Sequence, residues 1–162
     1  MGKNRRIPFS IKLTVTLLIL LCILLIFEYR RHKFIVKWVI DGDTIQLHND
    51  QQVKLIGVNT PEINQPFQSV EHYGREATAF TRKMVEGESV RLEYDKRLKD
   101  EYGRLLAYIY LKDGTLLNAE IIKQGYGHAY TRFPFRHLKE FMAFENEAKE
   151  NKRGLWAQIP QE

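Results

Sequence analysis

From residue 34 onward, short apolar segments alternate with turn residues. Residues 34–40 are rich in β-branched and aromatic side chains, residues 41–43 (Asp-Gly-Asp) interrupt them, and residues 44–48 resume with alternating apolar positions. A third segment, residues 52–58, ends at residues 59–61 (Asn-Thr-Pro). Apolar alternation bounded by turn residues of this kind predicts three strands joined by tight turns.

The period of the apolar positions changes after the third strand. Ala77, Phe80 and Met84 fall on one face of a helix over residues 74–86, and Gly87 follows as a stop. The other predicted elements are strands over residues 89–94 and 105–111, a helix over 116–124, and a last helix over about 134–152 followed by Gly154 and Trp156. Five strands with helices between and after them predict an α+β fold built on a small closed barrel.

The chain before residue 34 has a different character. Residues 13–27 are fifteen uncharged, mostly apolar positions. As a helix they would span roughly 22 Å of a ~30 Å hydrocarbon core, and extension to residues 11–29 gives about 28 Å if Lys12 and Glu28 reach toward the headgroups. We therefore predict a single-pass anchor. A cleaved signal peptide is the alternative, although the apolar run is followed by charged and bulky residues rather than by a small-x-small cleavage site.

The predicted organisation is a basic N-terminal tail over residues 1–12, a transmembrane signal-anchor over 13–29, a juxtamembrane linker over 30–33 and one globular domain over 34–158. The chain has 25 Lys and Arg against 20 Asp and Glu, a formal net charge of +5. Residues 1–37 hold eight of these basic side chains and one acidic one, which leaves 17 basic and 19 acidic groups in the rest. The basic balance therefore belongs to the N-terminal flank and does not by itself indicate nucleic-acid binding.

The cysteine and histidine content excludes several kinds of site. Cys22 is the single cysteine, so the chain has no intramolecular disulfide, redox pair or cysteine-cluster zinc site. No two of the five histidines are spaced to share a helical face, which argues against a zinc hydrolase.

Polar groups gather at three places where apolar segments end: residues 41–44, the stretch from Lys54 to Glu62, and residues 102–104. Each alone has a structural explanation, because Asp-Gly is a common turn, Asn-Thr-Pro-Glu can begin a helix, and an isolated arginine is usually a solvated charge. Together they offer carboxylates for a hard cation, a general base in Glu62 and a fixed cationic donor in Arg104. Those groups are what attack of water on a phosphodiester requires.

Three blocks of sequence carry a more specific signal: residues 39–44 (VIDGDT), 55–62 (LIGVNTPE) and 100–109 (DEYGRLLAYI). They resemble the three signature blocks of the staphylococcal nuclease (thermonuclease) family. Residues 73–86 and 118–125 are similar to the family's first two helices, and residues 147–156 to the end of the third. The resemblance covers about residues 34–156 in collinear order, which is far more specific than one short motif.

The resemblance implies a five-stranded OB-fold barrel with three helices, preceded here by the predicted transmembrane helix. It also implies a site for one Ca²⁺. By position, Asp43 and Asn59 would bind the calcium through their side chains and Thr60 through its backbone carbonyl, with waters and a substrate phosphate oxygen completing the shell. Asp41 would lie close to the calcium without binding it directly.

The resemblance further implies hydrolysis of DNA and RNA, with single strands preferred. Glu62 would activate the attacking water as general base, and Arg104 and Lys54 would hold the phosphate and neutralise its developing charge. Tyr102 and Tyr130 would lie along the bound nucleotide.

Two positions depart from the family pattern. The family has an arginine where this chain has Lys54, and an ammonium offers one point charge in place of a planar fork. Loss of such a donor costs roughly 10²–10³-fold in rate at comparable sites. The family has an aspartate where this chain has Asn59, so we expect weaker calcium binding.

The sequence therefore predicts a Ca²⁺-dependent phosphodiesterase, an endonuclease held at a membrane. The alternative is a catalytically weakened OB-fold module that binds single-stranded nucleic acid or a partner protein. The anchor is flanked by basic residues on both sides, so charge does not decide its orientation. We expect a cytoplasmic N-terminus and an exported domain, because a weak calcium site fills at the millimolar-scale calcium found outside cells. No protein partner is implied.

Overall fold

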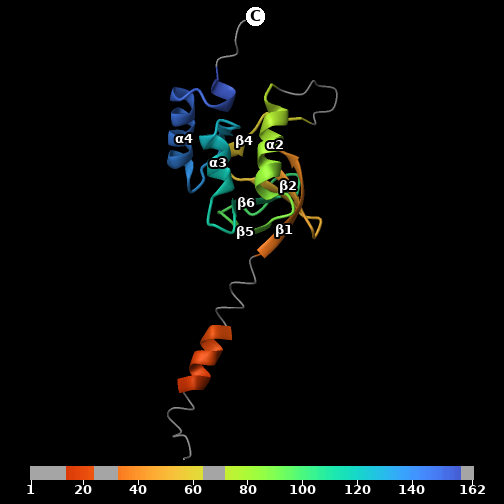
Figure 1. Ribbon diagram of the computed structural model, residues 1–162, viewed down its shortest axis with the longest axis vertical. Coiled ribbons are helices and arrows are strands. Elements are labelled where there is room, and N and C mark those ends of the chain that lie inside the picture. The colour runs from red at the N-terminus through yellow and green to blue at the C-terminus, as the bar shows by residue number, and fades with distance from the viewer. Residues whose placement is uncertain (1–13, 24–32, 64–71, 158–162) are drawn as a thin grey trace, which may run out of the picture. The chain divides into compact units, whose positions relative to one another are not determined.

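The computed structural model describes residues 14–23, 33–63 and 72–157, which belong to two separate units, Met1–Lys33 and Phe34–Glu162 (Figure 1). In the first unit, residues 14–23 form a helix whose side chains are exposed. Of the helices in the described ranges, none has both the length and the apolar character that crossing a bilayer requires. The predicted anchor covers residues 13–29, of which residues 13 and 24–29 lie outside the described residues.

In the second unit, five strands close into a barrel in the order β1-β2-β3-β6-β5. Their bounds are β1 Lys33–Asp41, β2 Thr44–Leu47, β3 Gln52–Leu55, β5 Ser89–Glu93 and β6 Leu105–Tyr110. The predicted five-stranded α+β barrel is therefore confirmed. β1, β2 and β3 follow one another as antiparallel neighbours because short turns join them.

The pairing of β3 with β6 is parallel, which brings together segments that are far apart in sequence. Lys54 lies opposite Leu106, and Leu55 lies opposite Ala107. A parallel pair needs a long crossover connection, and here the chain between the two strands contains a helix and β5. This pairing places the start of β6 beside Lys54.

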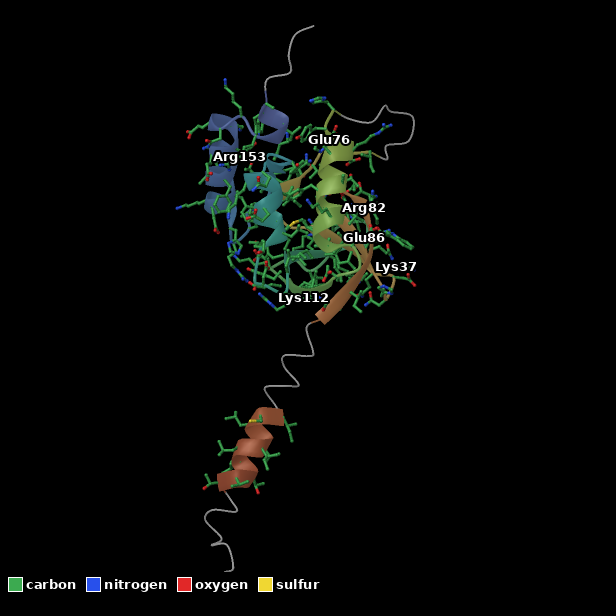
Figure 2. The ribbon with its side chains drawn as sticks, in the orientation of Figure 1. Lys37, Glu76, Arg82, Glu86, Lys112 and Arg153 are labelled. Carbon is green, nitrogen blue, oxygen red and sulfur yellow. The ribbon has the colours of Figure 1, made fainter. Side chains whose placement is uncertain are left out.

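Three helices pack against the barrel: α2 Gly74–Val85, α3 Leu117–Lys123 and α4 Leu138–Glu150, followed by a short 3₁₀ turn, η1 Gly154–Trp156. α3 lies between α2 and α4 (Figure 1). Thr81 of α2 donates a hydrogen bond to the carbonyl oxygen of Gly42 at 2.6 Å. Glu86, directly after α2, accepts a hydrogen bond from the amide of Val39 at 3.1 Å and pairs with Arg82 (Figure 2). The helix therefore holds both β1 and the turn that follows it.

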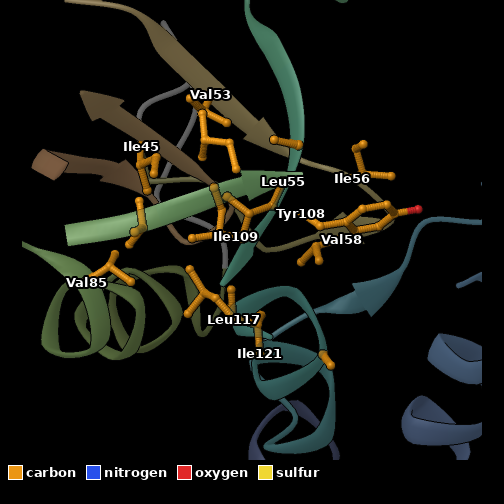
Figure 3. Packing of buried hydrophobic residues seen from close by; sticks show 14 of the residues in the cluster. Ile45, Val53, Leu55, Ile56, Val58, Val85, Tyr108, Ile109, Leu117 and Ile121 are labelled. Atoms are coloured by element: carbon orange, nitrogen blue, oxygen red, sulfur yellow. The ribbon is translucent and has the colours of Figure 1, made fainter. Parts of the chain in front are cut away.

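The apolar core fills the barrel and the space between the barrel and the helices. Ile45, Val53 and Ile109 come from three of the strands, and Val85 and Leu117 come from α2 and α3 (Figure 3). All five are essentially inaccessible to solvent. Since the burial of such side chains contributes about 1.5–3 kcal/mol each, the core fixes the strand ends that carry the polar groups.

Two predicted elements differ from the observed ones. The predicted strand over residues 52–58 breaks at Gly57, which has a φ of 75°, and the chain resumes as β4 (Val58–Asn59), paired with β7 (His128–Ala129). A left-handed residue cannot continue a strand, so β3 ends at Leu55. The last helix begins at Leu138 rather than near residue 134.

Candidate active site

The turn between β1 and β2 buries a carboxylate that is hydrogen-bonded through both of its oxygens. The Asp43 side chain is 2% exposed. Its Oδ1 accepts hydrogen bonds from the Thr44 hydroxyl at 3.0 Å and from the Lys54 ammonium, with which it forms an ion pair. Its Oδ2 accepts a hydrogen bond from the amide of Thr60 at 3.0 Å. The carboxylate thus joins the β1–β2 turn to β3 and to the end of β4.

Asp41 lies next to this buried carboxylate and is partly buried itself. Burial, together with repulsion from Asp43, raises the pKa of Asp41 to about 7, although the Lys54 ammonium opposes the change. Two carboxylates are therefore crowded into one poorly solvated place with a single lysine between them. An added cation would be attracted there.

Thr60 is held close to this turn by two glycines. A Cβ on Gly42 would lie 2.7 Å from the Thr60 hydroxyl oxygen, and one on Gly127 would lie 3.0 Å from its methyl carbon. A side chain at Gly42 would therefore push β4 away from the Asp43 carboxylate. The hydroxyl of Thr60 is buried and has no hydrogen-bond partner among the described residues.

Arg104 reaches the site from the turn that precedes β6. Its Nε donates a hydrogen bond to Asp100 Oδ2 at 2.7 Å, and its backbone amide donates to Asp100 Oδ1 at 3.0 Å. Partial burial acts to raise the pKa of Asp100, but hydrogen bonds and the charge of Arg104 outweigh it, so the pKa lies below its ordinary value. The guanidinium of Arg104 lies 5.3 Å from the ring of Tyr102, which is 76% exposed. Asp100 thus orients the arginine.

A cavity of about 630 Å³ lies where these elements meet. Five of the predicted site residues line it: Lys54 from β3, Asn59 from β4, Tyr102 and Arg104 from the turn before β6, and Tyr130 after β7. The amide of Tyr130 donates a hydrogen bond to the carbonyl of Gly57 at 2.9 Å, which fixes the segment after β7 beside the β3–β4 turn. Asp43 is joined to this group through Lys54, and Thr60 is joined to it through Asp43.

Glu62 is half-buried and follows Thr60 by two residues. Among the described residues that line the cavity, Glu62 does not appear. The chain after Ile63 lies outside the described residues until His72. The predicted role of Glu62 as general base therefore stays a prediction.

The cavity also has lining residues that the sequence reasoning missed, chiefly Arg132 and Phe133, together with Lys96. A signal was present in the sequence, because residues 130–136 (YTRFPFR) interleave aromatic and basic side chains as nucleic-acid-binding segments do. The prediction of a continuous helix from residue 134 obscured it.

The sequence profile described as "Staphylococcal nuclease homologue" matches residues 52–158 of this chain. The chain belongs to the staphylococcal nuclease family. Within this family, the thermonuclease of Staphylococcus intermedius is 41% identical over 135 residues, which cover 80% of this chain and 79% of that protein. The thermonuclease of Staphylococcus hyicus is 38% identical over 123 residues, covering 74% of this chain and 72% of that protein.

A third relative in the family comes from outside the staphylococci. Endonuclease YncB of Bacillus subtilis is 36% identical over 124 residues, which cover 73% of this chain and 58% of that protein. The family assignment agrees with the barrel order and with the three helices.

Proposed function

We propose that this chain is a nuclease that hydrolyses phosphodiester bonds of DNA and RNA. The observation that carries the proposal is the meeting of Lys54 and Arg104 at one cavity, next to the buried Asp43 carboxylate. Two cations at one concave site suit a phosphate that gains negative charge in the transition state. The names of the relatives, two thermonucleases and an endonuclease, support the same activity.

The proposed cofactor is Ca²⁺, and the donor groups near Asp43 fit a hard cation. Asp43 supplies a carboxylate, Asn59 an exposed amide oxygen and Thr60 a backbone carbonyl, with Asp41 as a second negative charge nearby. The described residues contain no group of three His, Cys, Asp or Glu side chains that could hold a metal. Water and a substrate phosphate would therefore complete the set, which suits a weak calcium site.

In the proposed reaction, a water oxygen forms a bond to phosphorus while the bond from phosphorus to the leaving oxygen breaks, and the leaving oxygen takes up a proton from solvent water to become a hydroxyl. Glu62 takes the proton of the attacking water. Arg104, oriented by Asp100, and Lys54 donate hydrogen bonds to the phosphate oxygens, and both cations are already in place before the charge develops. Bound calcium would supply further positive charge to the phosphate. Tyr102 and Tyr130 line the same cavity and would position the nucleotide.

A second function rests on one specific observation. The Lys54 ammonium already neutralises Asp43 in the structure, and Asn59 brings no charge, so the Asp43 carboxylate is balanced without a metal. Such a site would suit a module that binds single-stranded nucleic acid without cleaving it.

The substitution Glu62→Gln separates these two functions. We expect it to lower the hydrolysis of labelled single-stranded DNA by about 10²–10⁴-fold, because an amide cannot accept the proton of the water. Hydrolysis would be followed across a calcium titration, with a chelator as blank and with Glu76→Gln on the exposed face of α2 as the matched control (Figure 2).

Full activity of Glu62→Gln would remove this residue as the base. If the unaltered chain binds the DNA in the same assay but cleaves none at any calcium concentration, the binding module is the correct function.

We also propose that residues 13–29 hold the protein in a membrane, with the N-terminus in the cytoplasm and the nuclease domain exported. The apolar side chains of residues 14–23 are exposed, which is costly in water and favourable in lipid. Export would place the calcium site in a calcium-rich compartment. A secreted form would arise if the segment were cleaved.

A further inference from the structure

Two large apolar side chains of β1 lie on the outside of the barrel. Ile35 is 48% exposed and Trp38 is 47% exposed, whereas Val36 and Val39 of the same strand are buried in the core. One exposed apolar side chain needs no explanation, but neighbouring ones that form a patch mark a contact surface. The proposed chemistry uses neither Ile35 nor Trp38.

A bulge in β1 turns Trp38 outward. Val36 pairs with Leu47, and Trp38 pairs with Gln46. Lys37 is therefore an extra residue of β1 that faces no residue of β2. Strict alternation from the buried Val36 would also bury Trp38. The extra residue shifts the alternation, so that the indole lies outside and the next apolar position returns to the core.

The charges beside this part of β1 are neutralised in pairs. The Lys37 ammonium is bonded to Asp50 at 2.9 Å and lies 4.4 Å from the centre of the Trp38 ring. Two further carboxylates bordering β1 have basic partners: Glu86 with Arg82, and Glu88 with Lys112 (Figure 2). Apolar side chains among neutralised charges suit an apolar or interfacial occupant better than a polyanion such as nucleic acid.

The place of β1 in the chain indicates a lipid surface as that occupant. The proposed membrane segment ends at Tyr29, and the globular unit begins five residues later at Phe34. Since an extended chain spans at most ~3.6 Å per residue, this connection is no longer than about 18 Å. Tryptophan is enriched at the boundary between hydrocarbon and water, because its ring is apolar and its N–H is polar.

We propose that Ile35 and Trp38 form a lipid-contact surface, through which the globular unit lies against the headgroup region of the membrane that holds residues 13–29. The inference rests on the proposed membrane segment and is independent of the proposed hydrolysis. Lys37, on its flexible stem beside the indole, would exchange Asp50 for a lipid phosphate. Among the described residues that line the cavity none belongs to β1, so lipid and nucleic acid would not compete for the same side chains.

The tryptophans of the chain make this contact measurable. Trp38 and Trp156 are the only two, so Trp156→Phe leaves Trp38 as the single indole and Trp38→Phe leaves Trp156. Trp156 belongs to η1, at the opposite end of the globular unit from the start of β1 (Figure 1). Both full-length variants would be incorporated into phosphatidylcholine vesicles with or without bromine on the acyl chains near the headgroups, because bromine quenches indole fluorescence only at short range.

We expect brominated lipid to remove at least about half of the Trp38 emission and less than about a tenth of the Trp156 emission. The quenching should persist in ~1 M salt, since an apolar contact is not screened. Ile35→Glu, made in the Trp156→Phe chain, should lower the quenching of Trp38 at least about twofold, because it brings a charge into the contact. Met142→Glu is the matched control, since Met142 is 45% exposed on α4, and it should leave the quenching unchanged.

The lipid-contact surface is refuted if Trp38 is quenched no more than Trp156, if Ile35→Glu and Met142→Glu act alike, or if salt abolishes the quenching. Trp38 emission that ignores lipid but shifts to shorter wavelength with protein concentration would assign this surface to a second copy of the chain instead. Full-length protein that fails to float with the vesicles would remove the membrane segment and the surface together. Flotation without quenching of Trp38 would remove the surface alone, and neither result bears on the hydrolysis of DNA.

Discussion

At the scale of single residues, Lys54 has two neighbours that need its charge. Its ammonium is bonded to the buried Asp43 carboxylate, and it also lines the cavity where a phosphate would bind. An arginine could serve both groups at once through its fork, whereas one ammonium must divide its donors between them. A cation that binds Asp43 therefore competes with Lys54 for the same carboxylate oxygen.

This competition predicts the effect of Lys54→Met on calcium binding. Removal of the ammonium leaves Asp43 Oδ1 available and removes a repulsive positive charge, so we expect the calcium affinity to rise about 3- to 10-fold. Isothermal titration calorimetry measures this without reference to activity. Lys96→Met is the matched control at another cavity position, and an unchanged or lower affinity in Lys54→Met would contradict the competition.

The raised pKa of Asp41 predicts how the free energy of unfolding depends on pH when calcium is absent. Since burial and Asp43 raise its pKa from 3.8 to about 7, the folded protein holds this proton more tightly than the unfolded chain does. The resulting stabilisation is complete below pH 3.8 and is lost as the pH rises through about 7.

An asparagine at this position cannot ionise. Relative to the unaltered chain, Asp41→Asn should therefore gain on the order of 4 kcal/mol in the free energy of unfolding between pH 4 and pH 8. Denaturant titrations at both pH values in a chelator would show it, with Asp50→Asn as a control at an exposed position. Parallel stability changes for Asp41→Asn and the unaltered chain would show that Asp41 ionises normally.

At the scale of elements, one buried amide joins α3 to β6 and to the β3–β4 turn. Asn118 accepts a hydrogen bond from the amide of Ile109 at 2.9 Å and donates to the carbonyls of Ile56 at 2.9 Å and Ala107 at 3.3 Å. Its side chain is inaccessible to solvent. These bonds hold the β3–β4 turn, in which the carbonyl of Gly57 accepts the hydrogen bond from the amide of Tyr130.

Asn118→Ala should therefore lower the free energy of unfolding by about 3 kcal/mol, because it leaves buried backbone groups without partners. Asn146→Ala, on the exposed face of α4, should change it by no more than about 0.5 kcal/mol. Thermal and denaturant unfolding measure both changes. A loss below 1 kcal/mol for Asn118→Ala would mean that water replaces the amide, an outcome in conflict with the described packing.

Apolar periodicity was sufficient for the barrel strands and α2, because each of these elements buries a regular face. It predicted the wrong end for the strand that breaks at Gly57 and the wrong start for the last helix, which begins after residues 134–137. Gly57 breaks the strand through its positive φ, and its lack of a side chain makes room for the ring of Phe135, which would lie 2.5 Å from a Cβ there and comes from a distant part of the chain. The late start of α4 depends on the bond from the Arg136 amide to Asp95, another long-range contact.

At the scale of the whole molecule, the order of sequence blocks grouped residues that lie far apart in the chain. Motif position assigned Lys54, Asn59, Tyr102, Arg104 and Tyr130 to one site, and the structure brings all five to one cavity. Arg132 and Phe133, which line the same cavity, were not assigned in this way, because neither matches a position to which the resemblance gives a role. Their place in the wall follows from contacts of residues 130–136 with Gly57 and Asp95.

The division into two units predicts that the nuclease domain works without the N-terminal segment. A fragment that begins at residue 33 retains every strand of the closed barrel and should be active in solution at a rate within about twofold of the full-length chain in detergent.

Full-length protein expressed in a bacterium should sediment with membranes and be released by detergent but not by high salt. Recovery of the full-length chain in the soluble fraction would contradict the anchor.

The parallel pairing of β3 with β6 has a consequence for the time at which the enzyme comes into being. A growing polypeptide that has emerged only through β5 already contains Lys54 and Asp43, but it lacks Arg104, Tyr130 and the strand that holds β3 in place. Arg104 directly precedes β6 and Tyr130 directly follows β7, so all three arrive only after β5. Under the proposed function, the nascent chain therefore lacks groups needed to cleave the messenger RNA from which it is translated, and it gains them only when β6 and the segment after β7 have been added.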